Sequence, residues 1–313
     1  MASRATVGTV FAMLCVIWGS TWLAIRIGLE STPPFFAASL RFALAVAVLI
    51  PIMLWRRSKL PSGRTEWTLV AFVGLVLYAG DYGLIYWGEG NGVPSGLSAI
   101  LFSTFVLQTA IVAHVILAAE KLTPQKVAGI GLGFAGILLI FWGELSSAAS
   151  GNAFPMLAIV LAATCAAVAN VAAKRWGHDT DPISFTGVSM AVGAAALAAF
   201  SLGAGEPWGP PPWPSGLLAI VYLALAGSVV TFVSFWWLLK RIDVTSASYI
   251  AMVIPIVAVF LGFTVGSEVL DPLAIGGAVV TLAGIFLAVN RRLAAWAGRL
   301  GAAPASDPPG PPL

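Results

Sequence analysis

The chain is a series of long apolar runs joined by short polar connections. An α-helix needs about 20 apolar residues to cross the roughly 30 Å hydrocarbon layer of a membrane. Ten runs have about this length, at 6–27, 35–55, 67–88, 94–118, 124–142, 154–174, 184–202, 215–239, 244–266 and 272–290. The pattern predicts an all-α integral membrane protein with ten transmembrane helices.

Composition and charge support this interpretation and add an orientation. Hydrophobic residues make up 59% of the chain and charged residues 9%, against about 25% charged residues in soluble domains. With ten crossings, every lysine and arginine except Arg26 and Arg41 falls on the same side of the membrane. The positive-inside rule then predicts a multi-pass protein of the inner (cytoplasmic) membrane with both termini cytoplasmic. The basic residues are spread over short loops, so no nucleic-acid partner is expected.

The sequence also resembles itself. Shifting it by 148 positions aligns similar residues along most of its length, including Glu120 with Glu268, Pro124 with Pro272, Gly129 with Gly277 and Gly136 with Gly284. We therefore predict two related units of five helices, at 1–150 and 151–293, followed by a disordered cytoplasmic tail at 294–313. Because five crossings is an odd number, the second unit should be inverted relative to the first.

Inverted repeats of this kind are typical of transporters. Their substrates bind near the middle of the membrane, between the two repeats, and the repeats rock to expose that site to each side in turn. The repeat therefore predicts a secondary transporter that works by alternating access.

Four segments carry a resemblance to a known family. WGSTWLAIRIGLE with PPFFAASLRF, and EKLTPQKVAGIGLGFAGILL with EVLDPLAIGGAVVTLAGIFL, resemble the paired signatures of the EamA-type branch of the drug/metabolite transporter superfamily. The resemblance covers about residues 6–290 and implies a ten-helix transporter of small metabolites, often an exporter, without ATPase machinery. The tyrosine-rich third helix and the abundant tryptophan are most similar to YddG-type exporters of aromatic amino acids.

The stretch YAGDYGLIYW, residues 78–87, places an acid deep in a membrane helix. Such a group costs about 2.5 to 3.5 kcal/mol on insertion scales and is a functional hypothesis by default. The repeat does not reproduce its polar residues, because the positions 148 residues after Tyr78, Asp81 and Tyr82 hold Ala226, Val229 and Val230. Residues needed only for the shared fold should recur in both halves. The asymmetric ones are better candidates for contact with a substrate.

We therefore predict a substrate-binding cluster of Trp18, Tyr78, Asp81, Tyr82 and Gln108. At 1.5 Å per residue, Tyr78 lies about 16 Å and Trp18 about 18 Å from the cytoplasmic edge. Asp81 would bind a substrate amine or carry a coupling proton. The alternatives are packing between helices for the aromatic residues and a buried hydrogen bond to serine or threonine for Asp81.

Several other residues receive structural interpretations. Glu120 and Glu268 are expected to cap helices or form ion pairs, with a substrate role as the alternative. Arg26 and Lys174 would extend towards headgroups or meet a substrate carboxylate. Small glycines would allow close helix approach. An aromatic belt at the membrane interfaces is predicted for Trp55, Trp67, Tyr86, Trp87, Trp142, Trp236 and Trp237.

The predicted function is export of small metabolites, most of all aromatic or hydrophobic amino acids or related amphipathic compounds. No P-loop, H-E-x-x-H motif or metal-binding His/Cys cluster is present in the sequence, so we expect no enzyme activity, no cofactor, no metal and a monomer. Phosphorylated substrates are disfavoured because no deep lysine or arginine is evident. The alternatives are a membrane-embedded enzyme or receptor, or a transporter of another class such as purines or drugs.

Overall fold

The computed structural model describes residues 4–140, 142, 153–211, 213–257 and 272–289. All regular secondary structure in these ranges is helical. The first half contains α1 (Arg4–Leu29), α2 (Pro34–Arg56), α3 (Gly63–Val73), η1 (Gly74–Asp81), α4 (Tyr82–Gly90), α5 (Ser95–Ser103), α6 (Phe105–Ile116) and α7 (Pro124–Ile140). The second contains α9 (Ala153–Trp176), α10 (Pro182–Gly203), α11 (Ser215–Ala224), η2 (Leu225–Val230), α12 (Thr231–Leu239), α13 (Val244–Ser248) and α15 (Pro272–Val289).

The helices match the apolar runs of the sequence. Within the described residues, seven continuous helices are long and apolar enough to cross a membrane, and three shorter apolar helices occupy the remaining runs, at Pro124–Leu139, Val244–Val257 and Ile275–Ala288. The protein is therefore a multi-pass membrane protein, helical throughout the regular structure described. The boundary predicted near residue 150 and the tail at 294–313 lie outside the described residues.

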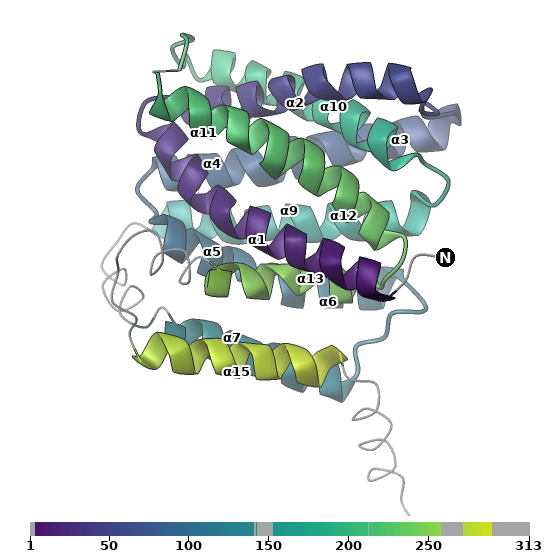
Figure 1. Cartoon of the computed structure of the whole chain (residues 1–313), viewed down its shortest axis with the longest axis vertical. Helices are drawn as coiled ribbons and strands as arrows, with labels where there is room; N and C mark the ends of the chain where they lie inside the picture. The colour runs from purple at the N-terminus through teal and green to yellow at the C-terminus, as the bar shows by residue number, and fades with distance from the viewer. Residues whose placement is uncertain (1–3, 141, 143–152, 212, 258–271, 290–313) are drawn as a thin grey trace, which may run out of the picture.

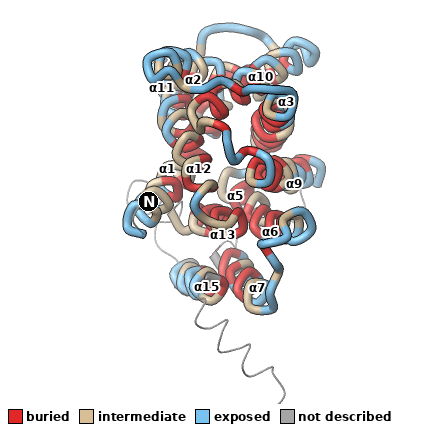
Figure 2. The backbone as a smooth tube through the Cα atoms, turned by 90° about the vertical axis from the view of Figure 1, so that its right-hand side faces the viewer, coloured by how far each residue is buried: buried red, intermediate tan, exposed pale blue. Residues whose placement is uncertain are grey.

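The helices lie side by side in layers (Figure 1). Helices α2, α10 and α3 are at the top of that view, the α7–α15 pair is at the bottom, and α1, α12 and α9 lie between them. Viewed towards the helix ends, buried residues face the interior of the bundle and many outer faces are exposed (Figure 2). The exposed outer faces are rich in leucine, valine and phenylalanine, which is the pattern of a protein whose surroundings are lipid.

The two halves have corresponding elements. Helices α2 and α10 begin 148 residues apart, as do α7 and α15. Two π-helical segments also correspond, because shifting η2 back by 148 residues places it at 77–82, over most of η1. A π-helix is rare and usually marks a functional site. The internal similarity therefore extends to an uncommon backbone feature in the third helix of each half.

Corresponding helices pack against each other in opposite directions. Where α7 meets α15, a methyl group added at Gly129 would touch Gly284, and one added at Gly136 would touch Gly277. Residue numbers thus rise along one helix as they fall along the other. These contacts agree with the expectation that glycines at the four positions let two backbones approach closely.

Helices α2 and α10 are antiparallel in the same way. The ring of Phe35, at the start of α2, lies 6.2 Å from that of Phe200 near the end of α10. Beyond the other end of α2, the carbonyl of Lys59 accepts a 2.6 Å hydrogen bond from Ser184. Both helix pairs therefore join the first half of the chain to the second.

Candidate functional site

A cavity lies between helices of the two halves. Its walls come from α1, η1, α4, α5, α6, α9, α12, α13 and the helical residues that follow α13. The lining residues are Trp18, Thr21, Trp22, Ile25, Leu77, Asp81, Tyr82, Ile85, Phe102, Phe105, Ala166, Asn170, Phe232, Phe235, Ala247, Ile250, Ala251 and Ile254. We refer to it as the central cavity.

Irregular backbone surrounds the central cavity. Leu77 and Asp81 belong to η1, and Phe232 is the second residue after η2. The fourth helix of each half is interrupted, at Thr104 between α5 and α6 and at Tyr249 after α13. In transporters, interrupted membrane helices gather at the substrate site because a cavity or neighbouring protein can satisfy their freed backbone groups.

Aromatic rings form one wall of this cavity. Trp18 lies 5.5 Å from Phe232 and 5.3 Å from Phe235 between ring centroids, and Tyr82 lies 5.9 Å from Phe232. Edge-to-face and tilted contacts at such distances stabilise an aromatic cluster. The same rings offer faces and edges to a flat apolar ligand.

Three polar atoms of the lining are buried without a hydrogen-bond partner in the described structure. They are Asp81 Oδ1, Asn170 Oδ1 and Trp18 Nε1. Leaving a buried polar group unpaired costs about 1 to 3 kcal/mol, so such groups normally have partners. The unpaired atoms are thus two acceptors and one donor, and no lysine, arginine or histidine belongs to the lining. It suits a ligand that carries hydrogen-bond donors and a positive charge.

The five residues predicted for substrate binding divide into two groups. Trp18, Asp81 and Tyr82 line the central cavity together. Tyr78 is fully buried behind it, with its ring 5.2 Å from that of Phe42, and its hydroxyl accepts a 3.4 Å hydrogen bond from the indole of Trp236.

Gln108 also lies outside the lining. Its Nε2 donates to the hydroxyl of Thr104, at 3.1 Å, and to the carbonyl of Val160, at 3.3 Å. In this conformation it joins α6 to α9. Direct substrate contact remains a prediction for all five residues, and the present geometry places three of them where such contact can occur.

Arg41 is the main residue that sequence reasoning missed. It is fully buried, so the expectation that the protein has no deep basic side chain is wrong. Its Nε donates to the Ser228 hydroxyl at 2.9 Å, and its Nη2 donates to the Gly227 carbonyl at 2.8 Å. The guanidinium lies 4.7 Å from the centroid of the Tyr82 ring, a cation–π distance. The only signal in the sequence was its position seven residues inside an apolar helix.

The prediction of an aromatic belt was wrong for two residues. Tyr86 is 1% exposed, and its hydroxyl accepts a 3.4 Å hydrogen bond from Arg41. Trp236 is 3% exposed and packs 5.0 Å from the Phe185 ring. Both were assigned to the belt because of their nearness to helix ends, but they face the helix bundle. Trp55, by contrast, is 84% exposed, as a lipid-contacting belt residue would be.

Glu120 and Lys174 are used to close helix ends. The Glu120 carboxylate accepts hydrogen bonds from the backbone N–H groups of Val244 and Thr245, at 2.9 and 3.2 Å, and so caps the start of α13. This agrees with its interpretation as a cap. The Lys174 ammonium donates to the carbonyls of Leu239 and Ile242 just after α12, so it does not extend towards headgroups. Glu268 lies outside the described residues.

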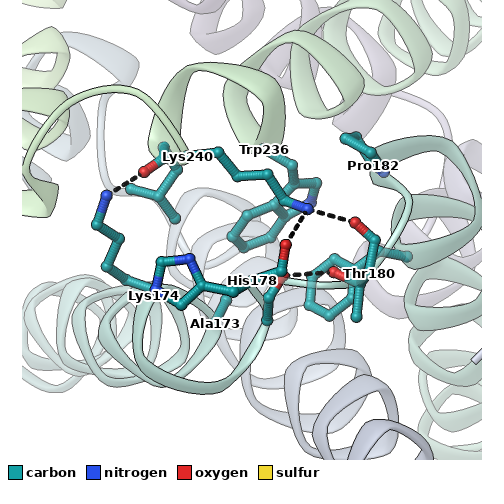
Figure 3. A pocket seen from close by; sticks show the side chains of 10 residues that line it. Ala173, Lys174, His178, Thr180, Pro182, Trp236 and Lys240 are labelled. Atoms are coloured by element: carbon teal, nitrogen blue, oxygen red, sulfur yellow. Dashed lines mark hydrogen bonds between the residues drawn. The ribbon is translucent and has the colours of Figure 1, made fainter.

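Lys174 also borders a small hollow between the end of α9 and the end of α12 (Figure 3). The Lys240 ammonium reaches across it to the backbone carbonyls of His178 and Thr180. Burial lowers the pKa of the Lys240 ammonium. Because both lysines already bind protein carbonyls, this hollow is a tie between chain segments and a poorer candidate for a ligand site than the central cavity.

Comparison with known proteins gives the family. The model of the EamA-like transporter family matches residues 6–142 and 153–290. The chain belongs to this family. The two matched segments begin 147 and end 148 residues apart, which agrees with the internal similarity of the sequence. The family supports transport, in line with the expectation that the protein is not an enzyme.

Relatives cover nearly the whole chain. It is 33% identical over 291 residues to the uncharacterised inner membrane transporter YedA of Escherichia coli K12, covering 91% of each protein. It is 28% identical to the uncharacterised transporter YoaV of Bacillus subtilis, covering 87% of this chain and 92% of that one. A solved crystal structure matches with a TM-score of 0.75 at 22% identity, over 92% of this chain and 98% of the other, which shows a shared fold.

Proposed function

We propose that this EamA-like protein is a secondary exporter of small amphipathic amines, amino acids with aromatic or hydrophobic side chains among them. The observation that carries the proposal is the central cavity, where the buried Asp81 carboxylate has an unpaired oxygen beside a wall of aromatic rings. Arg41 is close enough to attract Asp81 electrostatically, but Asp81 Oδ1 has no hydrogen-bond partner and is open to a donor from a ligand. In a flat apolar molecule that carries an ammonium group, the ammonium can bind Asp81 and the flat part can pack on the aromatic wall.

The amine is the polar anchor in this proposal. No basic side chain lines the central cavity, and the Nε and Nη2 donors of Arg41 are already bound to η2. A substrate carboxylate would therefore have only neutral donors, namely the indole N–H of Trp18, the amide N–H of Asn170 and nearby hydroxyls. Phosphorylated substrates are disfavoured for the same reason, since phosphate is normally held by lysine or arginine.

The proposed mechanism is alternating access by two inverted repeats of five crossings each. Three observations support it: corresponding helices pack antiparallel, the two π-helices correspond, and the family model matches the two halves separately. Rocking of one repeat against the other would open the central cavity to each side in turn. Cytoplasmic termini follow from the distribution of lysine and arginine.

The test is counterflow into liposomes that contain the purified protein. Tryptamine, tryptophan, adenine and glucose 6-phosphate form a suitable panel because they vary charge and ring separately. We expect tryptamine to exchange fastest, tryptophan more slowly, and the phosphate not at all. A phosphorylated compound as the best ligand would overturn the proposed chemistry. Absence of flux across a broad panel of amines, amino acids and purines would favour an enzyme or receptor.

A further inference from the structure

A second hollow lies between the end of α1 and the connection from α4 to α5. It is lined by Arg26, Leu29, Glu30, Glu89, Gly90, Gly92, Val93 and Pro94. We refer to it as the distal cavity. Neither the family nor the proposed function assigns a role to it.

Glu89 is the unusual member of this lining. Both of its carboxylate oxygens are buried and have no hydrogen-bond partner in the described structure. The Ser98 hydroxyl lies near it but makes no hydrogen bond of acceptable geometry. Arg26 is close enough to attract Glu89 electrostatically, yet the two are not joined as an ion pair. Its two carboxyl oxygens are therefore open to hydrogen-bond donors from a ligand in the cavity.

The distal and central cavities follow one another along the same helices. Asp81, the last residue of η1, is spaced by four residues from Ile85 of α4, and Ile85 by four from Glu89, so the three lie near one another along this continuous helix. Eight residues correspond to about 12 Å along the axis. Ile85 lines the central cavity and separates the two carboxylates.

Helix α1 contributes to both cavities as well. Its residues Trp22 and Ile25 line the central cavity, and Arg26 and Leu29, in the next turn, line the distal one. The central and distal cavities therefore follow one another along α1 and α4, about two helical turns apart.

We propose that Glu89, assisted by Glu30, forms a second binding site for primary ammonium groups, which receives the amine after it leaves Asp81. The inference rests on the proposed function, because it takes the same class of ligand. Two carboxyl groups and one guanidinium line the distal cavity, and the unpaired Glu89 oxygens offer acceptors to an ammonium group. Arg26 attracts Glu89 and Arg41 attracts Asp81, so a bound amine shares each carboxyl group with a guanidinium and can be released from both sites.

Equilibrium binding of radiolabelled tryptamine to the purified full-length protein in detergent tests the inference. We expect two equivalents for the unaltered protein, one for Glu89→Gln, one for Asp81→Asn and none for the double variant. Asp179→Asn, which removes an exposed acid outside both cavities, should retain two. Glu30→Gln should retain two sites with at least a threefold weaker second one. Melting temperatures establish that each variant is folded.

The outcomes separate the two claims. If Glu89→Gln binds as much tryptamine as the unaltered protein, the distal site is overturned. If one equivalent binds and only Asp81→Asn removes it, the distal site fails while the proposed function stands. If Asp81→Asn leaves binding intact and Glu89→Gln removes it, the distal site stands and the central site fails. If no tryptamine binds to the unaltered protein, both claims fail.

Discussion

The two π-helices of this protein share a position and differ in chemistry. In η1, the first half presents Tyr78 and Asp81, and the 148-residue shift places Ala226 and Val229 at these positions of η2. Asp81 faces the central cavity. The same backbone irregularity is therefore part of a shared scaffold, while the charge is carried by one half alone.

The contacts of the two segments differ in a related way. The carbonyl of Gly227 and the hydroxyl of Ser228 in η2 accept hydrogen bonds from Arg41, a residue of α2 in the first half. The corresponding residue of α10 is Ser189, whose hydroxyl is buried and unpaired in the described structure. Both deep charges thus come from the first half, and one of them stabilises the second. The helices of the two halves correspond, but the charged side chains between them do not, which suits a ligand that is itself asymmetric.

The largest effect should come from removing the charge of η1. Asp81→Asn keeps the size of the side chain but replaces a charge-assisted hydrogen bond, so tryptamine counterflow should fall about 10- to 100-fold. The melting temperature in detergent should change little. Val229→Ala, at the corresponding position of η2, should transport nearly normally. Normal flux in Asp81→Asn would return this carboxylate and its aromatic neighbours to a packing role.

The next effect concerns Arg41. Arg41→Met leaves the two acceptors of η2 without their donor, and each unpaired buried group costs about 1 to 3 kcal/mol. The melting temperature should therefore fall clearly, whereas Ser189→Ala should change stability by less than about 0.5 kcal/mol. Arg41→Lys should rescue only partly, because an ammonium cannot reproduce the guanidinium fork. Equal stability of Arg41→Met and Ser189→Ala would contradict this assignment.

Where the two halves are alike, substitutions should have matching effects. Gly136→Ala and Gly284→Ala each introduce a methyl group into backbone of the facing helix, so each should destabilise the protein by about 1 to 3 kcal/mol. Gly131→Ala provides the control, since nothing lies within 4 Å of the added methyl group, and it should be neutral or stabilising. The melting temperatures of the three variants test this prediction. A loss of stability in only one of the variants Gly136→Ala and Gly284→Ala would argue against symmetric packing.

The smallest effect should come from the cap of α13. Glu120→Gln replaces a carboxylate that accepts two backbone hydrogen bonds, and loss of a cap costs about 0.5 to 2 kcal/mol. Most of this loss is expected because glutamine places an N–H2 donor where one carboxylate oxygen had accepted a hydrogen bond. The measurement is the melting temperature of Glu120→Gln compared with that of Asp179→Asn, a control that changes an exposed acid. A change in substrate affinity with unchanged stability would instead assign Glu120 a role in binding.

The location of the helices was predictable because it depends on properties that are local in sequence. A run such as 35–55 must be helical and span the bilayer whatever its neighbours are, since lipid cannot satisfy backbone N–H and C=O groups. Repetition at 148 residues predicted which elements would correspond. It could not predict the π-helices, because their extra residue per turn has no residue signature in LAGSVV or GLVLYAGD.

The candidate site was predictable only where depth and chemistry coincided. Trp18, Asp81 and Tyr82 were identified because polar or aromatic residues are costly or unusual deep in a membrane helix, and asymmetry between the halves set them apart. Tyr78 is asymmetric in the same way as Tyr82 and lies about one helical turn from it, yet it lies behind the cavity. The two side chains point in directions that differ by less than a half turn around the helix, and this difference places one in the cavity wall and the other behind it. The spacing of residues in the sequence does not define which side of the helix faces the cavity.

The sequence by itself determined the membrane environment, the helix locations, the repeat and the presence of a deep acid, because each follows from the transfer of residues from water to lipid or from counting along the chain. Only the tertiary structure decided which buried polar residues contact one another. Arg41 and Tyr86 resemble interfacial residues in sequence but are buried together, and Asn170 joins Asp81 at the central cavity from the other half. Whether a polar group faces lipid, protein or cavity depends on the packing of helices far apart in sequence, so no local pattern could reveal it.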